Sequence, residues 1–172
     1  FGNHFIGIDE LRRYSAKVDI SVPICAPEIP WDWKTWSVKS ADHLLVLGAS
    51  QMSDGSPLNL LSLRKHFGID PDKSQPCFYN QDWFLNEQFA SRQLECKWNL
   101  ICTSLEDASR GRNPETLSKD FTFPSAIACT FIFFLAWFHF SKILWEHEFV
   151  WCDDVDNNGD RIYVGKYNDT AG

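Results

Sequence analysis

The sequence predicts an α+β domain in which a central apolar helix packs on a mostly antiparallel sheet with a C-terminal β-hairpin. The first observation behind this prediction is residues 121–140, FTFPSAIACTFIFFLAWFHF, which contain no charged side chain. The second is the Asn158-Gly159 turn signal between two alternating segments. The other predicted strands and helices do not alternate as in a βαβ series, which favours α+β over α/β. With 172 residues, the chain fits one globular domain, residues 1–172.

The net charge of the chain indicates which classes of partner it can bind. The formal net charge of −7 disfavours nucleic acid and anionic lipid, and the basic clusters are short. We therefore expect no nucleic-acid partner, and instead a protein or small molecule that the sequence does not identify. Aromatic residues are numerous, with 14 Phe, 8 Trp and 4 Tyr, so either the core or an exposed surface is rich in rings.

The N-terminal third predicts one helix and one connector. Residues 7–18, GIDELRRYSAKV, are typical of a short helix that Asp9 would cap. Residues 22–30, VPICAPEIP, carry three prolines and predict an extended connector. Three tryptophans follow the connector and either anchor it on the core or form a ligand-binding surface: Trp31, Trp33 and Trp36.

A buried strand and a well-marked helix come next. Residues 43–49, HLLVLGA, are continuously apolar, as in an interior strand. Residues 56–68, SPLNLLSLRKHFG, predict a helix with Ser56 at its N-cap and Pro57 at its first position. Gly68 would end this helix in a left-handed conformation.

The middle of the chain carries weaker signals. Residues 83–94 predict a short helix, residues 97–105 a strand, and the polar residues 106–120 a long exposed segment. Trp83 and Trp98, together with the three earlier tryptophans, are candidates to line a groove for a peptide, a sugar or a flat ligand.

The uncharged run is better explained as a core helix than as a membrane span. Pro124 and Ser125 form a helix start, which leaves an apolar helical part of about 15 residues, short for a bilayer. The helical pattern then continues as an amphipathic segment through residues 141–148, and no run of basic residues flanks it. We therefore expect no membrane partner; the alternative, membrane association through residues 125–140, predicts that the protein needs detergent.

The C-terminal hairpin contains the sharpest local motif. In DVDNNGD the alternating oxygen donors are Asp154, Asp156, Asn158 and Asp160, with glycine at the sixth place. This pattern matches the first half of a calcium loop, but Gly165 occupies the twelfth place, where a bidentate glutamate is expected. Two interpretations stay open: a polar hairpin turn with no cofactor, or a site for a divalent cation such as calcium.

The number and positions of the cysteines indicate the redox state of the cellular compartment. The chain has six and no C-x-x-C pair, and several lie in apolar segments. Buried free thiols fit these positions and predict a reducing, cytoplasmic location.

Three segments carry a resemblance: QPCFYNQDWFLNEQFA (75–90), FPSAI (123–127) and WCDDVDNNGDRIYVGKY (151–167). They resemble segments of uncharacterised bacterial proteins with no known activity. The resemblance implies a bacterial or phage origin and assigns no site residue.

Two functional hypotheses follow from the sequence. The first is a soluble binding or interaction module with an aromatic-rich surface at Trp31, Trp33 and Trp36. It rests on the many aromatic residues and the lack of a complete catalytic motif. The alternative is a divalent-metal-dependent hydrolytic enzyme that uses the acidic loop 153–160.

Overall fold

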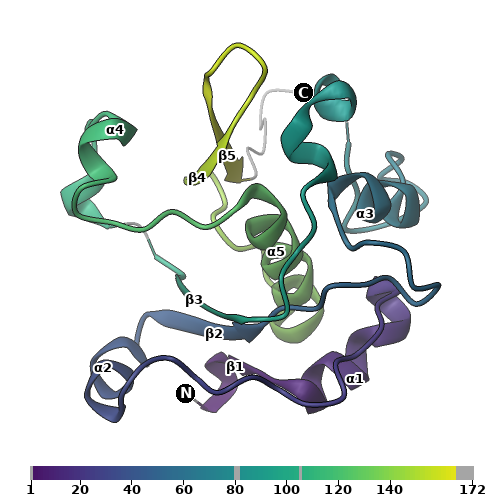
Figure 1. Ribbon diagram of the computed structural model, residues 1–172, viewed down its shortest axis with the longest axis horizontal. Helices are drawn as coiled ribbons and strands as arrows, with labels where there is room; N and C mark the ends of the chain where they lie inside the picture. The colour runs from purple at the N-terminus through teal and green to yellow at the C-terminus, as the bar shows by residue number, and fades with distance from the viewer. Residues whose placement is uncertain (1, 80–81, 105, 166–172) are drawn as a thin grey trace.

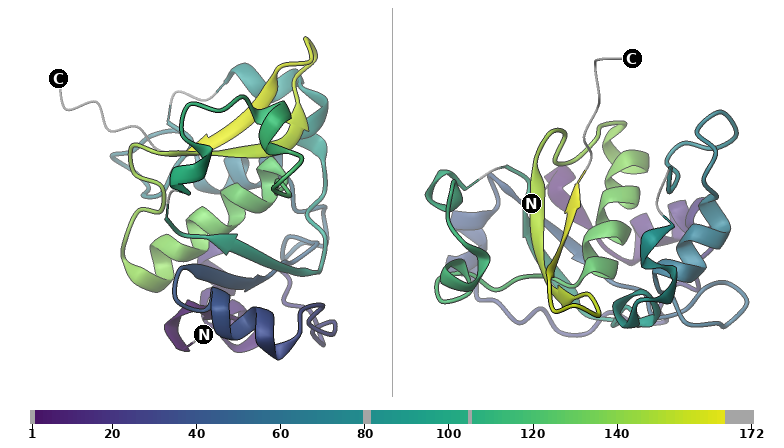
Figure 2. Two further views of the ribbon diagram at one scale, coloured as in Figure 1. Left: turned by 90° about the vertical axis from the view of Figure 1, so that its left-hand side faces the viewer. Right: turned by 90° about the horizontal axis from the view of Figure 1, so that it is seen from above.

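Helix α5 lies at the centre of the structure, between a three-stranded sheet and the β4–β5 hairpin (Figures 1 and 2). This structure is a computed structural model and describes residues 2–79, 82–104 and 106–165. It confirms the predicted α+β class and the C-terminal hairpin. The elements in chain order are η1 (Gly2–His4), β1 (Phe5–Ile6), α1 (Ile8–Val18), α2 (Trp33–Lys39), β2 (His43–Leu47), α3 (Leu60–Phe67), η2 (Trp83–Asn86), η3 (Gln88–Ser91), β3 (Trp98–Cys102), η4 (Asp107–Ser109), α4 (Pro114–Leu117), α5 (Ala126–Phe140), β4 (Phe149–Val155) and β5 (Arg161–Gly165).

The three-stranded sheet has β2 in the middle, with β1 parallel to it and β3 antiparallel. All five residues of β2 are buried, as the continuous apolar run predicts for an interior strand. The β4–β5 hairpin forms a separate two-stranded sheet instead of extending the first one. The two sheets therefore cover different sides of α5 (Figure 2). Leu105, at the end of the predicted strand 97–105, lies outside the described residues.

Helix α1 matches the prediction in extent but not in its cap. Gly7 is the N-cap, and its amide donates a hydrogen bond of 2.9 Å to the carboxylate of Glu10. Asp9, the predicted cap, instead lies in the first turn and pairs with Arg12 at 2.9 Å. The carboxylate at the third helical position thus satisfies the backbone amide of the N-cap residue, which is one half of a capping box.

Two helices differ from the sequence expectation. Helix α2, which the sequence did not predict, follows the proline-rich connector and starts where the Asp32 carboxylate accepts the Thr35 amide at 2.8 Å. Helix α3 begins four residues after the predicted Ser56 cap, because Asn59 and Ser62 form a reciprocal capping box. The helix ends at Gly68, as predicted, and Gly68 has a positive φ of +70°, but its ψ of −168° places it outside the left-handed helical conformation that the sequence predicted.

The segments between α3 and α5 are mostly irregular. The predicted helix 83–94 is instead the two short turns η2 and η3. The segment 106–120 is largely exposed, as predicted, and is attached to the protein through the buried side chain of Leu117.

Helix α5 is the predicted core helix. The Ser125 hydroxyl accepts the Ala128 amide at 3.2 Å, and ten of the fifteen helical residues are buried. The predicted amphipathic continuation through residue 148 is wrong: α5 ends at Phe140, and Ser141 has a φ of +55°. Trp145 is buried and donates a hydrogen bond to the Cys102 carbonyl at 3.2 Å, which draws the chain back towards the sheet. No helix among the described residues has the length and apolarity that crossing a bilayer requires.

Candidate functional site

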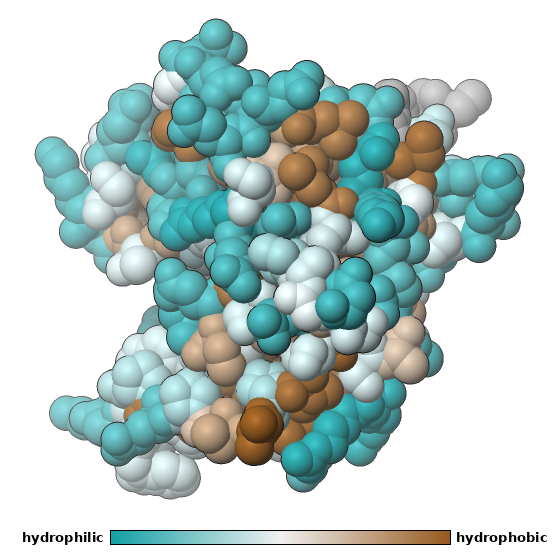
Figure 3. Space-filling view, turned by 45° about the vertical axis from the view of Figure 1, so that its right-hand side comes forward, coloured by the Kyte–Doolittle hydropathy of each residue, from teal (hydrophilic) through white to brown (hydrophobic). Residues whose placement is uncertain are grey.

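An aromatic groove lies between the β4–β5 hairpin, helix α5 and the segment that leads through η2 and η3. Its volume is about 730 Å³, within the range of about 300–1,000 Å³ typical of small-molecule sites. Apolar side chains reach the surface in both the upper and the lower half of the face shown in Figure 3. The fold thus leaves a concave apolar surface beside its central helix.

The floor of the groove is rigid because it belongs to the core. Phe134 of α5 is 4% exposed, and its ring meets Phe78 edge to face at 5.2 Å and Phe67 at 4.4 Å. Phe78 in turn packs against Phe84 at 6.0 Å. The buried hydroxyl-bearing residue Thr130 also lines the floor, one helical turn before Phe134. Edge-to-face ring pairs of this kind hold each ring in a defined orientation.

The walls carry four aromatic side chains that remain exposed: Tyr79, Trp83, Phe149 and Tyr163. Trp83 is 55% exposed although its ring lies 5.7 Å from that of Phe89. On the hairpin side, Phe149 and Tyr163 contact each other at 4.9 Å between ring centroids. Exposed rings gathered around one concavity are typical of a binding surface.

Two carboxylates line the groove beside these rings. The Asp156 carboxylate accepts the amides of Asp160 and Asn158, both at 2.8 Å, and the Asp160 amide is the main cause that lowers the pKa of Asp156. Asp160 itself also lines the groove. Arg161 lies there too, but its guanidinium donates to the Cys152 carbonyl at 2.9 Å and covers Phe123. One hydrogen bond to a neutral carbonyl leaves the guanidinium charge in place, so the two carboxylates and the one guanidinium that line the groove give it a net formal charge of −1.

The tryptophans predicted to bind ligand lie elsewhere, around α2. Trp33 is 79% exposed, whereas Trp31 and Trp36 are half-buried against the core. None of the three is among the described residues that line the groove. Helix α2 and the hairpin lie at opposite ends of the molecule in Figures 1 and 2. Ligand binding at these three tryptophans stays a prediction.

The predicted calcium ligands are spread over the hairpin. Asp154 is buried beneath it, where its carboxylate accepts the Ala126 amide at 2.6 Å and pairs with Arg92 at 2.7 Å. Asp156 bonds backbone amides of its own turn, and Asn158 and Asp160 are exposed. Within the described ranges, the one group of three neighbouring ligand atoms from His, Cys, Asp or Glu lies where β2 begins and β3 ends, not in this loop. Calcium binding here stays a prediction, which thermal midpoints in EDTA and in calcium would test.

The sequence pointed to part of the groove. Trp83 was among its groove candidates and does line the groove, whereas Trp98 is buried and donates to the Pro27 carbonyl at 2.8 Å. Tyr79, Phe149 and Tyr163 were not singled out. The alternation of Phe149 and Trp151 on β4 was the available signal for the hairpin residues.

Comparison with family models, with curated proteins and with solved structures finds no match for this chain. The resemblance to bacterial proteins therefore stays an expectation, and the groove has to be interpreted from its own chemistry.

Proposed function

We propose that this protein is a binding module whose aromatic groove takes a small organic cation with an apolar body. The observation that carries the proposal is the gathering of four exposed rings beside two carboxylates in one concavity. It keeps the predicted class of function, a binding module with an aromatic surface. It moves the binding surface from the tryptophans of α2 to Tyr79, Trp83, Phe149 and Tyr163.

The chemistry of the groove favours a cation over an anion. The face of an aromatic ring is electron-rich and attracts a cation by about 0.5–2 kcal/mol, more when water is excluded. The net negative charge of the groove lining, two carboxylates against one guanidinium, adds to this attraction. The apolar part of the ligand would lie against the floor, where burial stabilises binding by about 25 cal/mol for each Å² removed from water.

Tryptamine and indole-3-acetate provide a matched pair of probes, because they share a flat ring and carry opposite charges. We expect calorimetric titration to show saturable binding of tryptamine and at least about tenfold weaker binding of indole-3-acetate, about 1.4 kcal/mol. Equal affinity for the two would contradict the proposed preference for a cation. No binding of either would contradict the proposal as a whole.

Two tryptophan variants separate the groove from the α2 surface. Trp83→Ala should weaken tryptamine binding at least about tenfold, since removal of a ring at an aromatic site costs more than 1 kcal/mol. Trp33→Ala is the control, because Trp33 is even more exposed but lies outside the groove. If Trp33→Ala lost tryptamine binding and Trp83→Ala kept it, the binding site would lie at α2 and not in the groove.

We also propose that the protein works in the cytoplasm and without nucleic acid. All six cysteines are described and each is a free thiol, which favours a reducing compartment. The net charge of −7 opposes binding to a polyanion.

A further inference from the structure

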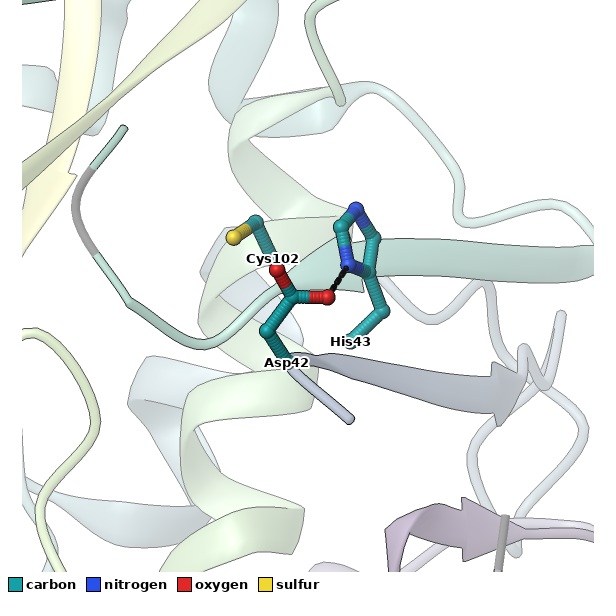
Figure 4. Close-up of side chains that lie close together, drawn as sticks. All are labelled: Asp42, His43 and Cys102. Carbon is teal, nitrogen blue, oxygen red and sulfur yellow. Dashed lines mark hydrogen bonds and ion pairs between the residues drawn. The ribbon is translucent and has the colours of Figure 1, made fainter. Parts of the chain in front are cut away.

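A second polar cluster lies at the sheet and takes no part in the groove. Its members are Asp42, His43 and Cys102 (Figure 4). One donor atom from each residue, a carboxylate oxygen, a ring nitrogen and a sulfur, lies within 4.8 Å of the other two. The cluster therefore brings together three different metal-ligand types at one point.

The sheet itself sets the positions of these residues. His43 begins β2 and is the direct partner of Cys102, the last residue of β3. The Asp42 carbonyl accepts both the amide and the hydroxyl of Thr103, each at 2.9 Å. The Cys102 carbonyl accepts the Trp145 indole at 3.2 Å. The three backbones are thus fixed by pairing that does not depend on the cluster's side chains.

The side chains form a half-open site. The Nδ1 atom of His43 lies 2.6 Å from an Asp42 carboxylate oxygen. This hydrogen bond with His43 lowers the pKa of Asp42. The His43 side chain is 9% exposed, and the Asp42 side chain is 50% exposed. The Cys102 thiol donates to the Ser104 carbonyl at 3.2 Å. The imidazole is therefore held in the protein, while the carboxylate faces water.

This arrangement does not suit a cysteine nucleophile activated by histidine. The nitrogen near the cluster, Nδ1, is already bonded to Asp42. Figure 4 shows the other ring nitrogen on the far side of the imidazole from the Asp42 carboxylate. A general base for the thiol would need a free ring nitrogen directed at the sulfur.

We infer that Asp42, His43 and Cys102 form a binding site for a divalent transition-metal ion of the zinc type. Thiolate, imidazole and carboxylate are the ligands that Zn²⁺ takes in proteins, whereas Ca²⁺ and Mg²⁺ prefer oxygen alone. A thiolate and a carboxylate together neutralise the two charges of the ion. Three protein ligands leave the fourth tetrahedral position for water or a ligand atom.

Metal binding would require two small changes. The Cys102 thiol would release its proton, because the thiolate is the ligand, so binding should strengthen as pH rises. The Asp42 oxygen and His43 nitrogen would separate from 2.6 Å to about 3.3 Å, the spacing of tetrahedral ligands about 2.0–2.1 Å from zinc. Asp42 is the half-exposed member of the pair and has room to move.

Cobalt(II) titration tests the site on the reduced chain of 172 residues. Cys25, Cys77 and Cys96 are first replaced by serine, because these thiols are exposed or half-buried and lie outside the cluster. We expect one Co²⁺ per chain, a near-ultraviolet thiolate-to-cobalt band, and displacement by Zn²⁺. Absence of the thiolate band would overturn the inference.

Two variants in the same background identify the ligands. Cys102→Ser should abolish the thiolate band and weaken Zn²⁺ binding by more than about 100-fold, since loss of an outer-shell partner alone costs about 10–100-fold. Asp42→Asn should weaken Zn²⁺ binding and keep the thiolate band. An unchanged band in Cys102→Ser would overturn the assignment.

Alkylation of the unmodified chain provides a test that needs no variant. Iodoacetamide labelling, followed by peptide mass spectrometry, should show that Zn²⁺ slows modification of Cys102 and leaves that of the exposed Cys25 unchanged. Equal rates at Cys102 with and without Zn²⁺ would contradict the site.

Discussion

The carboxylate of Asp154 accepts a hydrogen bond of 2.6 Å from the amide of Ala126, the first residue of α5. Its other oxygen pairs with Arg92 at 2.7 Å. A negative charge at a helix N-terminus is favoured both by the free amides and by the helix dipole. This one buried carboxylate therefore joins the hairpin, the central helix and the segment after η3.

Replacement of Asp154 should destabilise the protein. We expect Asp154→Ala to lower the free energy of unfolding by about 2–3 kcal/mol, because the variant loses charge-assisted hydrogen bonds in a buried site. Urea denaturation followed by circular dichroism measures this change. The matched control is Asp153→Ala, which breaks a more exposed ion pair with the same Arg92 and should cost about 1 kcal/mol or less. Equal losses in the two variants would contradict the structural role of Asp154.

The core elements were predictable because their signals are local. The Ser125 cap and the uncharged run identify α5, and the continuous apolar residues 43–47 identify β2. Both segments are continuously apolar, so the length of each run and the residues at its ends decide between helix and strand.

The boundaries that depend on distant contacts were not predictable. Ser56 and Pro57 are typical of a helix start, but Pro57 pairs with Gln51 in an isolated β-bridge. The N-cap of α3 is therefore Asn59. Likewise, the pattern after Phe140 is helical in spacing, yet burial of Trp145 against β3 turns the chain away. In both cases tertiary packing outweighs local propensity.

Most of the groove and the cluster of Asp42, His43 and Cys102 were not predicted, for the same physical reason. Phe149 and Trp83 are 66 positions apart by their residue numbers and line one groove only because the hairpin packs beside η2. Cys102 meets His43 only through the register of β2 and β3. A sequence shows which side chains are available but not which strands pair, so sites built across strands remain hidden.

Acid pH should weaken the hairpin turn through Asp156. The Asp160 amide lowers the pKa of Asp156 below the ordinary value of 3.8, so the folded state favours the ionised carboxyl. A depressed folded pKa contributes stability that is complete above the unfolded pKa and is lost as pH falls through the folded one. Carbon-detected NMR titration should therefore give a lower midpoint for Asp156 in the folded protein than in urea. A folded midpoint at or above the unfolded one would contradict the turn geometry.

The two buried thiols should be unreactive in the native protein. Cys129 of α5 and Cys152 of β4 are both fully buried, and their sulfurs lie 3.9 Å apart. Burial raises the pKa of Cys129 well above its ordinary value, which leaves little thiolate to react. Iodoacetamide should therefore label Cys25 in the native state, and Cys129 and Cys152 only after denaturation. Native labelling of Cys152 as fast as that of Cys25 would show that the hairpin opens away from α5.

Glycine at the end of α5 should stabilise the protein. Ser141 has a φ of +55°, a left-handed conformation that a side chain disfavours and glycine adopts freely. We expect Ser141→Gly to raise the free energy of unfolding by about 0.5–1 kcal/mol, as measured by urea denaturation. Ser40→Gly is the control, because Ser40 caps α2 with a φ of −65° and gains no relief from glycine. Equal destabilisation by Ser141→Gly and Ser40→Gly would contradict the left-handed conformation at Ser141. It would favour instead a helix that continues through residue 148.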